Sequence, residues 1–357
     1  MAHSETMVDV AGQPVVLTYS SVADEYEAMG RRAIVVNRSH RARMRFTGPK
    51  VPDVLTGLVT NDVGSLAAGQ GQYAAALTPK GKVIADLRIF RFEDFFLTDT
   101  GARARDGWSG VVRKYVNPRL ATATDESAAI GAIGIHGAQA RYVVEEITGI
   151  GHSALGLLAP YAHVSAEHDG FTMWVLRLPD LGVDGFELLV PADRFQETWD
   201  AALAARATPA GLAVWEVARV ESGRPEWGID MDDTTIPQEA NLDTLGAISY
   251  TKGCYTGQEV VARVHFRGHV NRTLRGLKAA GAEPPRPRAS LFDSEGKSVG
   301  DVRSAVISPR RGGIALGMVR REVENGATLV ARWSADPAGD DPPGEMPVQV
   351  VPLPFPD

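Results

Sequence analysis

Apolar and polar residues alternate with changing periods along the first hundred residues, and the period indicates where strands and helices lie. The runs A-I-V-V and R-M-R-F, within residues 31–46, predict two short strands, and residues 51–59 have the apolar spacing of a helix. Residues 73–99 predict β-structure around one tight turn, P-K-G-K at residues 79–82, because V-I-A-D-L-R-I-F alternates cleanly after it.

The middle of the chain mixes strands with helices. Residues 127–150 predict a strand, A-I-G-A-I-G-I, followed by a helix, and the runs F-T-M-W-V-L-R-L and G-F-E-L-L-V predict a hairpin. Helical spacing follows at residues 194–205 and 211–222. Because the elements do not alternate regularly, we expect an α+β fold rather than a doubly wound sheet.

The composition shifts near Gly281. The segment G-A-E-P-P-R-P-R is a candidate boundary, and the short runs A-S-L-F-D, S-V-G-D-V-R-S-A-V-I-S and G-I-A-L-G-M-V after it predict a small β-barrel. The proline-dense end, from residue 337, predicts an extended tail.

Length, charge and cysteine content limit the class of protein. A chain of 357 residues exceeds the size of one hydrophobic core, so two or three cores are expected. A net charge of -7 argues against broad capture of nucleic acid or anionic membrane, and no apolar run is long enough to span a bilayer. The first ten residues lack a signal-peptide pattern, and one cysteine cannot form an internal disulfide. We therefore expect a cytoplasmic protein.

Several familiar motifs are incomplete. His265 and His269 follow Cys254, but a closed zinc site needs four ligands and an iron–sulfur cluster usually needs four thiolates. We therefore expect no metal in the isolated chain, while a cluster shared with a partner stays open. The segment D-M-D-D, residues 230–233, predicts a solvated turn. The P-K-G-K turn lacks the full phosphate-loop pattern, which leaves a turn with solvated lysines or one that faces an anionic ligand.

The single cysteine, Cys254, lies in T-K-G-C-Y-T-G-Q-E-V-V-A-R, residues 251–263. Gly253 and Gly257 permit positive φ or a close approach, and a short helix is expected from Gly257. Lys252 and the helix start favour the thiolate, whereas Glu259 in the first turn opposes it. Polar neighbours indicate a functional thiol, with an inert cysteine as the alternative.

The octet K-G-C-Y-T-G-Q-E resembles the signature of the YgfZ family, folate-binding proteins related to the glycine-cleavage T-protein. The flanking segments N-L-D-T-L-G-A-I-S-Y and V-A-R-V-H-F-R-G-H-V-N-R fit the same pattern, and L-V-T-N-D-V, T-P-K-G-K-V-I-A-D-L and A-R-V-E-S-G-R-P resemble the T-protein superfamily. The resemblance runs from about residue 31 to the barrel. Besides Lys252 and Cys254, its motif residues are Gly253, Tyr255, Gly257, Gln258, Glu259 and Arg263.

The resemblance implies α+β lobes and a C-terminal β-barrel around a central channel that takes tetrahydrofolate. With the composition boundaries, it predicts a leader at residues 1–30 and a folate-binding region of two lobes at residues 31–275. A barrel at residues 276–336 and a proline-rich tail at residues 337–357 complete the expected organisation.

The resemblance also implies ligand contacts. Glu187, in G-F-E, corresponds to a glutamate expected to bind the pterin ring, and Arg219, in A-R-V-E-S-G, to an arginine at the ligand site. A strand glutamate facing solvent and a surface ion pair are the alternatives. T-proteins carry paired aspartates after the P-K-G-K-like turn, whereas this chain has Ala85 and Asp86. The broken pair argues against transferase chemistry, although Asp86 remains a candidate folate contact.

Two functions follow from the resemblance. The first is a tetrahydrofolate-binding accessory protein for iron–sulfur cluster assembly or repair, with assembly factors or client enzymes as partners. The second is a folate-dependent aminomethyltransferase of the T-protein type. The octet favours the first, the broken aspartate pair weakens the second, and whether the chain is an enzyme stays open.

Overall fold

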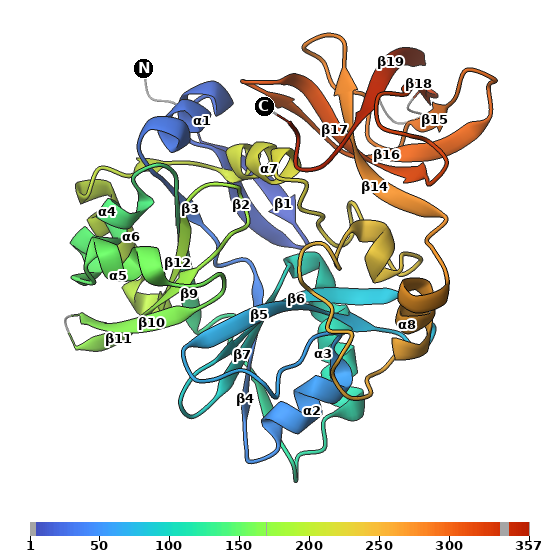
Figure 1. Cartoon of the computed structure of the whole chain (residues 1–357). Helices are drawn as coiled ribbons and strands as arrows, with labels where there is room; N and C mark the ends of the chain where they lie inside the picture. Colours follow the sequence, from blue (N-terminus) through green and yellow to red (C-terminus); the bar gives the residue numbers. More distant parts are fainter. Residues whose placement is uncertain (1–4, 169, 336–342, 357) are drawn as a thin grey trace.

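The computed structural model describes residues 5–168, 170–335 and 343–356, which form two α+β lobes and a barrel around a common centre (Figure 1). One lobe contains a five-stranded sheet and the other a six-stranded sheet. The α+β class and the C-terminal barrel expected from the sequence are confirmed. Short 3-10 turns occur at Ala102–Ala104, Ala192–Arg194 and Pro237–Ala240.

The five-stranded sheet separates an outer core from the centre of the molecule. Its order is β5 (Gln70–Leu77), β6 (Val83–Arg91), β7 (Phe96–Thr100), β4 (Ala42–Thr47) and β8 (Thr122–Asp125), with helices α2 (Val51–Leu58) and α3 (Arg105–Tyr115). Because strand side chains alternate between faces, Ala85, Leu87 and Ile89 of β6 enter the outer core, with Leu55 of α2 and Trp108 of α3. The intervening residues of β6 face the other way.

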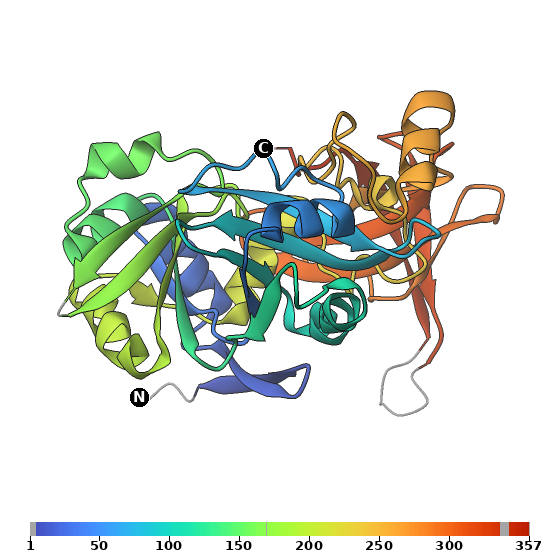
Figure 2. The ribbon, with the colours of Figure 1, turned by 90° about the horizontal axis from the view of Figure 1, so that it is seen from below.

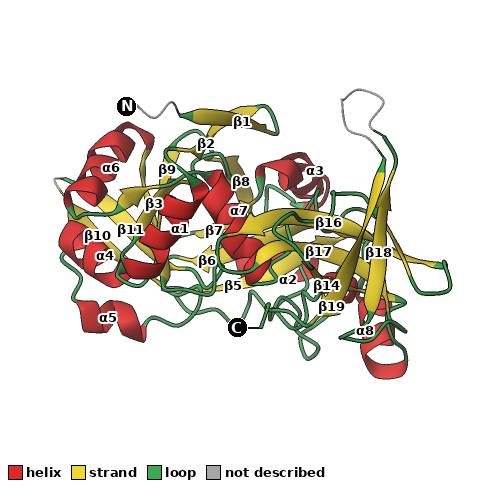
Figure 3. Cartoon of the chain, turned by 90° about the horizontal axis from the view of Figure 1, so that it is seen from above, coloured by secondary structure: helices red, strands yellow, loops and turns green. Residues whose placement is uncertain are grey.

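The six-stranded sheet carries helices on both faces. Its order is β10 (His163–His168), β11 (Phe171–Arg177), β12 (Gly185–Pro191), β9 (Ile130–His136), β3 (Ile34–Asn37) and β13 (Thr208–Pro209). One face packs against α4 (Ala140–Thr148), α5 (His152–Leu157) and α6 (Phe195–Ala204). The other packs against α1 (Val22–Arg31) and α7 (Leu212–Glu221), and α7 also contacts the barrel (Figure 3).

The barrel closes with six strands in the order β14 (Arg272–Ala279), β17 (Gly312–Arg320), β16 (Ser298–Ser308), β15 (Ser290–Phe292), β18 (Thr328–Trp333) and β19 (Gly344–Val351). The predicted barrel bounds, residues 276–336, are wrong at both ends, because β14 already begins at Arg272 and β19 pairs with both β14 and β18. Residues 344–351 therefore form a barrel strand and not part of an extended tail. Val348 and Val350 point into the barrel while Gln349 points outward, so the apolar alternation outweighs the proline content. Residues 336–342 and 357 of the expected tail lie outside the described residues.

The predicted N-terminal leader is also ordered where it is described. Residues 5–30 include a hairpin of β1 (Thr6–Val10) and β2 (Gln13–Thr18), seen at the lower edge of Figure 2, and most of α1. The buried carboxylate of Glu25 accepts backbone N–H bonds from Tyr19, Ser20 and Gly211. These bonds attach the segment to the start of α7.

Two substitutions on β19 test whether residues 344–351 form a strand of the barrel or an extended tail outside it. Val350→Asp places a charge inside the barrel and is expected to lower the free energy of unfolding by about 4 kcal/mol, because a buried charge has no partner there. Gln349→Asp, one residue away and exposed, is expected to change it by less than about 0.5 kcal/mol. Denaturant unfolding of both variants measures the difference, and equal stabilities would contradict the strand.

Candidate functional site

A polar cavity lies where the lobes meet, beside α7. Its lining comes from the β3–β4 loop, from β5 and β6, from the residue after β7, from the β11–β12 loop, and from α7 and the residues that follow it. The lining side chains are Arg38, Arg41, Tyr73, Asp86, Arg88, Asp180, Trp215, Arg219, Arg224, Pro225 and Glu226, with Gly101. The open space between them is about 50 Å³.

Because side chains alternate between the two faces of β6, the Asp86 side chain points into this cavity. The Tyr73 hydroxyl, on the paired strand β5, donates a hydrogen bond of 2.9 Å to its carboxylate. Burial raises the pKa of Asp86, although nearby Arg41 and the Tyr73 hydroxyl act to lower it. Ala85 lies on the opposite face of β6, fully buried in the outer core. An aspartate at position 85 would therefore not reach the cavity in this register, and the broken pair no longer argues against transferase chemistry.

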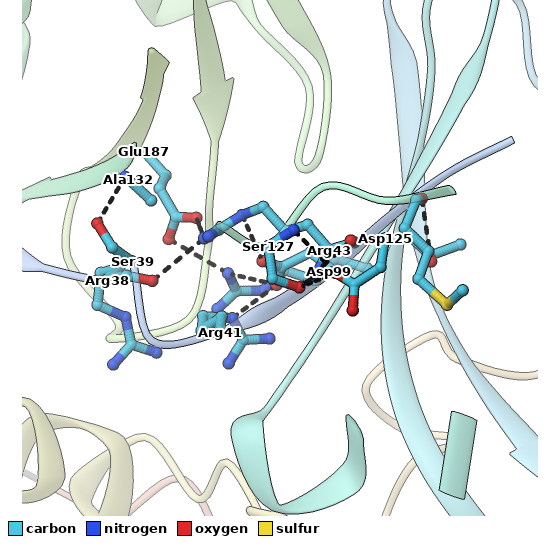
Figure 4. A network of polar contacts seen from close by, with 12 residues as sticks. Arg38, Ser39, Arg41, Arg43, Asp99, Asp125, Ser127, Ala132 and Glu187 are labelled. Atoms are coloured by element: carbon cyan, nitrogen blue, oxygen red, sulfur yellow. Dashed lines mark hydrogen bonds and ion pairs between the residues drawn. The ribbon is translucent and has the colours of Figure 1, made fainter. Parts of the chain in front are cut away.

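A buried ion-pair network joins the two sheets behind the cavity (Figure 4). The Arg43 guanidinium, from β4, lies 3.1 Å from Asp99 of β7 and 3.0 Å from Glu187 of β12. Arg41 binds Asp99 at 2.6 Å, and Arg88 lies 3.4 Å from Glu187. Burial alone would raise the pKa of Asp99, but the surrounding guanidinium groups hold it below its ordinary value.

The expected ligand residues are only partly brought together. Asp86 and Arg219 line the cavity. Glu187 does not line it, but its carboxylate contacts Arg88, which does. Arg219 binds Asp230 at 2.6 Å and the Ser304 hydroxyl of the barrel at 2.7 Å. Asp230 is fully buried, so the predicted solvated turn is wrong at that residue.

The cysteine motif lies outside the cavity lining. Cys254 is free and exposed, and Tyr255 beside it is buried in a hydrophobic core. The Lys252 ammonium donates three hydrogen bonds to backbone carbonyls near the end of α2: to Thr56, to Val59 at 2.6 Å and to Asn61 at 3.0 Å. Burial lowers the pKa of Lys252 to about 8. The sequence predicts a lysine that supports the thiolate, but all three of its N–H groups anchor the loop.

Two motifs noted in the sequence contact each other through glycines. Gly257 has φ +83 and precedes α8 (Gln258–Arg267), and a Cβ on it would lie 2.6 Å from the Thr78 carbonyl. Gly81, in the P-K-G-K turn, has φ +72, and a Cβ there would lie 2.7 Å from Val260 of α8. The start of α8 thus packs directly on the β5–β6 turn (Figures 1 and 2).

The two glycines that flank Cys254 offer a matched test of this contact. Gly257→Ala is expected to lower the free energy of unfolding by about 2 kcal/mol, because the methyl group meets a backbone carbonyl at positive φ. At Gly253 a Cβ meets nothing within 4 Å and φ lies outside the left-handed region, so Gly253→Ala is expected to be neutral. Thermal or denaturant unfolding measures both, and equal effects would contradict the predicted packing.

Metal ligands do not gather in the part of the chain that the structure describes: no group of three His, Cys, Asp or Glu side chains is arranged to hold an ion. The His265 ring stacks on Tyr250 with a centroid distance of 3.6 Å.

No helix among the residues that the structure describes is both long and apolar enough to cross a bilayer.

Apart from Arg219, the arginines of the cavity and its ion-pair network were missed by the sequence analysis. Arg38 and Arg41 come from the loop N-R-S-H-R, and Arg43 and Arg88 lie on strands whose neighbouring residues are apolar. A charged residue at alternate positions of a buried strand must find a partner, and this is the signal that could have identified them.

Comparison with known proteins identifies the fold. The crystal structure of glycine cleavage system aminomethyltransferase T from Bartonella henselae superposes with a TM-score of 0.87, covering 99% of this chain and 94% of that chain at 23% identity. The class is therefore the T-protein fold, two α+β lobes with a closed six-stranded barrel.

Sequence comparison identifies the family. Residues 1–249 match the GCVT N-terminal domain and residues 272–357 the glycine cleavage T-protein C-terminal barrel domain. An aminomethyltransferase of Thermosynechococcus vestitus is 30% identical over 347 residues, or 95% of this chain and 89% of that protein. One from Rubrobacter xylanophilus is 28% identical over 350 residues, or 98% and 90%. The chain belongs to the glycine cleavage T-protein family, and its membership of the YgfZ branch stays a prediction.

Proposed function

We propose that this protein binds tetrahydrofolate or a derivative in the central cavity and catalyses one-carbon transfer of the aminomethyltransferase type. The observation that carries the proposal is the direction of Asp86, which faces the cavity together with the Tyr73 hydroxyl. The T-protein family uses tetrahydrofolate or derivatives, and relatives covering nearly all of this chain are named aminomethyltransferase.

The cavity has the side chains that a pterin needs. A carboxylate such as Asp86 can accept hydrogen bonds from the donor edge of the ring, and guanidinium groups can donate to its carbonyl and ring nitrogens. The open space of about 50 Å³ is small, and we expect side chains to move when a bicyclic ring binds. Arg41 and Arg224 are candidates, since their side chains keep 11% and 13% exposure.

Asp86 is suited to hold or transfer a proton. Its raised pKa brings it closer to the working pH than an ordinary carboxyl, and the hydrogen bond from Tyr73 fixes the orientation of the carboxylate. Tetrahydrofolate, when bound, would accept the one-carbon group.

The test separates binding from chemistry. Calorimetry with tetrahydrofolate is expected to show binding by wild type and weaker but measurable binding by Asp86→Asn, because the amide keeps one acceptor oxygen for the pterin but loses the charge. In a reconstituted assay with the aminomethyl-lipoyl carrier, Asp86→Asn is expected to lose about 100-fold or more in turnover, because general acid–base groups contribute that much. Asp53→Asn, an exposed aspartate on α2, is the matched control.

Three outcomes would contradict the proposal. Wild type that does not bind tetrahydrofolate would exclude the ligand. Binding without turnover would exclude the transferase. Full activity of Asp86→Asn would exclude the role of Asp86.

A second candidate function is supported by Cys254. We infer that an exposed thiol on a loop anchored by Lys252 and Gly257 can meet a partner protein, as an accessory factor for iron–sulfur proteins requires. A lone thiolate can supply one ligand of a cluster completed by the partner, or form a mixed disulfide with it. Assembly factors or client enzymes of the cytoplasm would be the partners.

Replacement of the thiol tests this second role. Cys254→Ser is expected to leave folding and tetrahydrofolate affinity unchanged, because the side chain is exposed, and to abolish support of iron–sulfur enzymes in cells that lack the native protein. Thr251→Ser, three residues away and exposed, serves as the control. Full restoration of those enzyme activities by Cys254→Ser would show that the thiol is incidental.

A further inference from the structure

Arg38 is an unpaired guanidinium buried at the central cavity. The residue is 4% exposed, and its side chain makes no hydrogen bond or ion pair with any residue that the structure describes. The other four arginines of the cavity lining each have carboxylate partners: Arg41 has Asp99; Arg88 has Asp99, Asp180 and Glu187; Arg219 has Glu216 and Asp230; and Arg224 has Asp180. Arg38 alone among these five lacks one.

The surroundings hold the Arg38 side chain in place. Its guanidinium carbon lies 3.6 Å from the centre of the Trp215 ring on α7, and Figure 4 shows the group directed away from the Glu187 carboxylate. Gly134 of β9 provides room for the stem, because a Cβ there would lie 3.2 Å from Arg38 Cγ. On Trp215, the ring of His136 packs edge-on, and burial lowers the pKa of His136 to about 3, so it adds no charge. Trp215 and Gly134 therefore orient a cation toward an open space.

The charges near Arg38 are already committed. Asp99, Asp180 and Glu187 serve the other guanidinium groups of the cavity, and Asp86 accepts the hydrogen bond from Tyr73. The two further carboxylates whose charge acts on Arg38 also have closer partners, since Glu216 binds Arg219 and Glu226 binds Arg103. A buried guanidinium without a partner loses hydration that nothing replaces, and stacking on an aromatic ring recovers only part of it. Such a group is retained at a cost to stability when a ligand supplies the missing anion.

We propose that Arg38 binds a carboxylate group of a ligand in the central cavity. A guanidinium offers two parallel N–H donors to a carboxylate, which gives both charge and orientation. The inference rests on the proposed ligand site and adds a specific subsite to it. The carboxylate can come from the glutamyl part of a folate or from a separate small carboxylic acid bound beside the pterin.

The experiment compares wild type with Arg38→Met, which keeps the stem packed on Trp215 and removes the charge. The probes are tetrahydrofolate, p-aminobenzoylglutamate, a tetrahydropterin without the glutamyl part, and acetate and glycine as small carboxylates. Calorimetry gives affinities and thermal unfolding gives Tm. Arg38→Lys keeps the charge without the planar donor pair, and Arg31→Gln, on the exposed face of α1, controls for the loss of one positive charge.

A glutamyl source predicts that Arg38→Met loses tenfold or more in affinity for tetrahydrofolate and p-aminobenzoylglutamate while the tetrahydropterin binds both proteins equally. If the carboxylate comes from a separate small acid, wild type and Arg38→Met are expected to bind tetrahydrofolate equally. Acetate or glycine is then expected to bind wild type and raise its Tm, but not to do so in Arg38→Met. In both cases Arg38→Lys is expected to be intermediate, Arg31→Gln to behave as wild type, and the ligand-free Tm of Arg38→Met to equal or exceed that of wild type. A merely structural arginine would instead lower Tm.

The inference is overturned if no carboxylate-bearing probe distinguishes wild type from Arg38→Met. This failure differs from failure of the proposed function. If tetrahydrofolate binds both proteins equally and no small carboxylate separates them, only the Arg38 subsite is wrong. If wild type binds no tetrahydrofolate while a small carboxylate still requires Arg38, the proposed ligand is wrong and the carboxylate subsite holds.

Discussion

The relative position of the two lobes depends on charges that are buried between them. Arg43 from the five-stranded sheet binds Asp99 of its own sheet and Glu187 of the six-stranded sheet, with almost no access to water. Removing one partner from such a group leaves an uncompensated charge and typically costs about 3–5 kcal/mol, whereas the intact network contributes little net stability. Its effect is therefore geometric, because it permits one arrangement of the sheets and penalises displaced ones.

This geometry sets what the cavity can hold. The lobes bring together side chains from β5, β6, the β3–β4 loop and α7, and Arg219 links the same region to the barrel through Ser304. Both lobes thus line one small polar space, and the barrel is attached behind it. A ligand there contacts both lobes, so its binding energy also stabilises their mutual arrangement.

Much of the fold could be predicted from local sequence. The strand and helix of residues 127–150, the hairpin of β11 and β12, and the barrel runs after Gly281 follow from periodicity and turn residues. The strand β19 was missed because proline-rich flanks obscured the alternation of Val348 and Val350. For the site, the resemblance identified Asp86 and Arg219. It could not show that Ala85 faces the outer core, or that Arg38 lacks a partner, because both depend on tertiary packing.

The contact between the β5–β6 turn and α8 has a consequence for how this sequence can vary. Gly81 packs against Val260, and Gly257 packs against the Thr78 carbonyl, so neither segment has room for a side chain at its glycine. Substitutions on the two sides are expected to be non-additive, since a larger residue on one side needs a compensating change on the other. We therefore expect substitutions in the loop that carries Cys254 to be tolerated only together with substitutions in the hairpin that carries Tyr73 and Asp86.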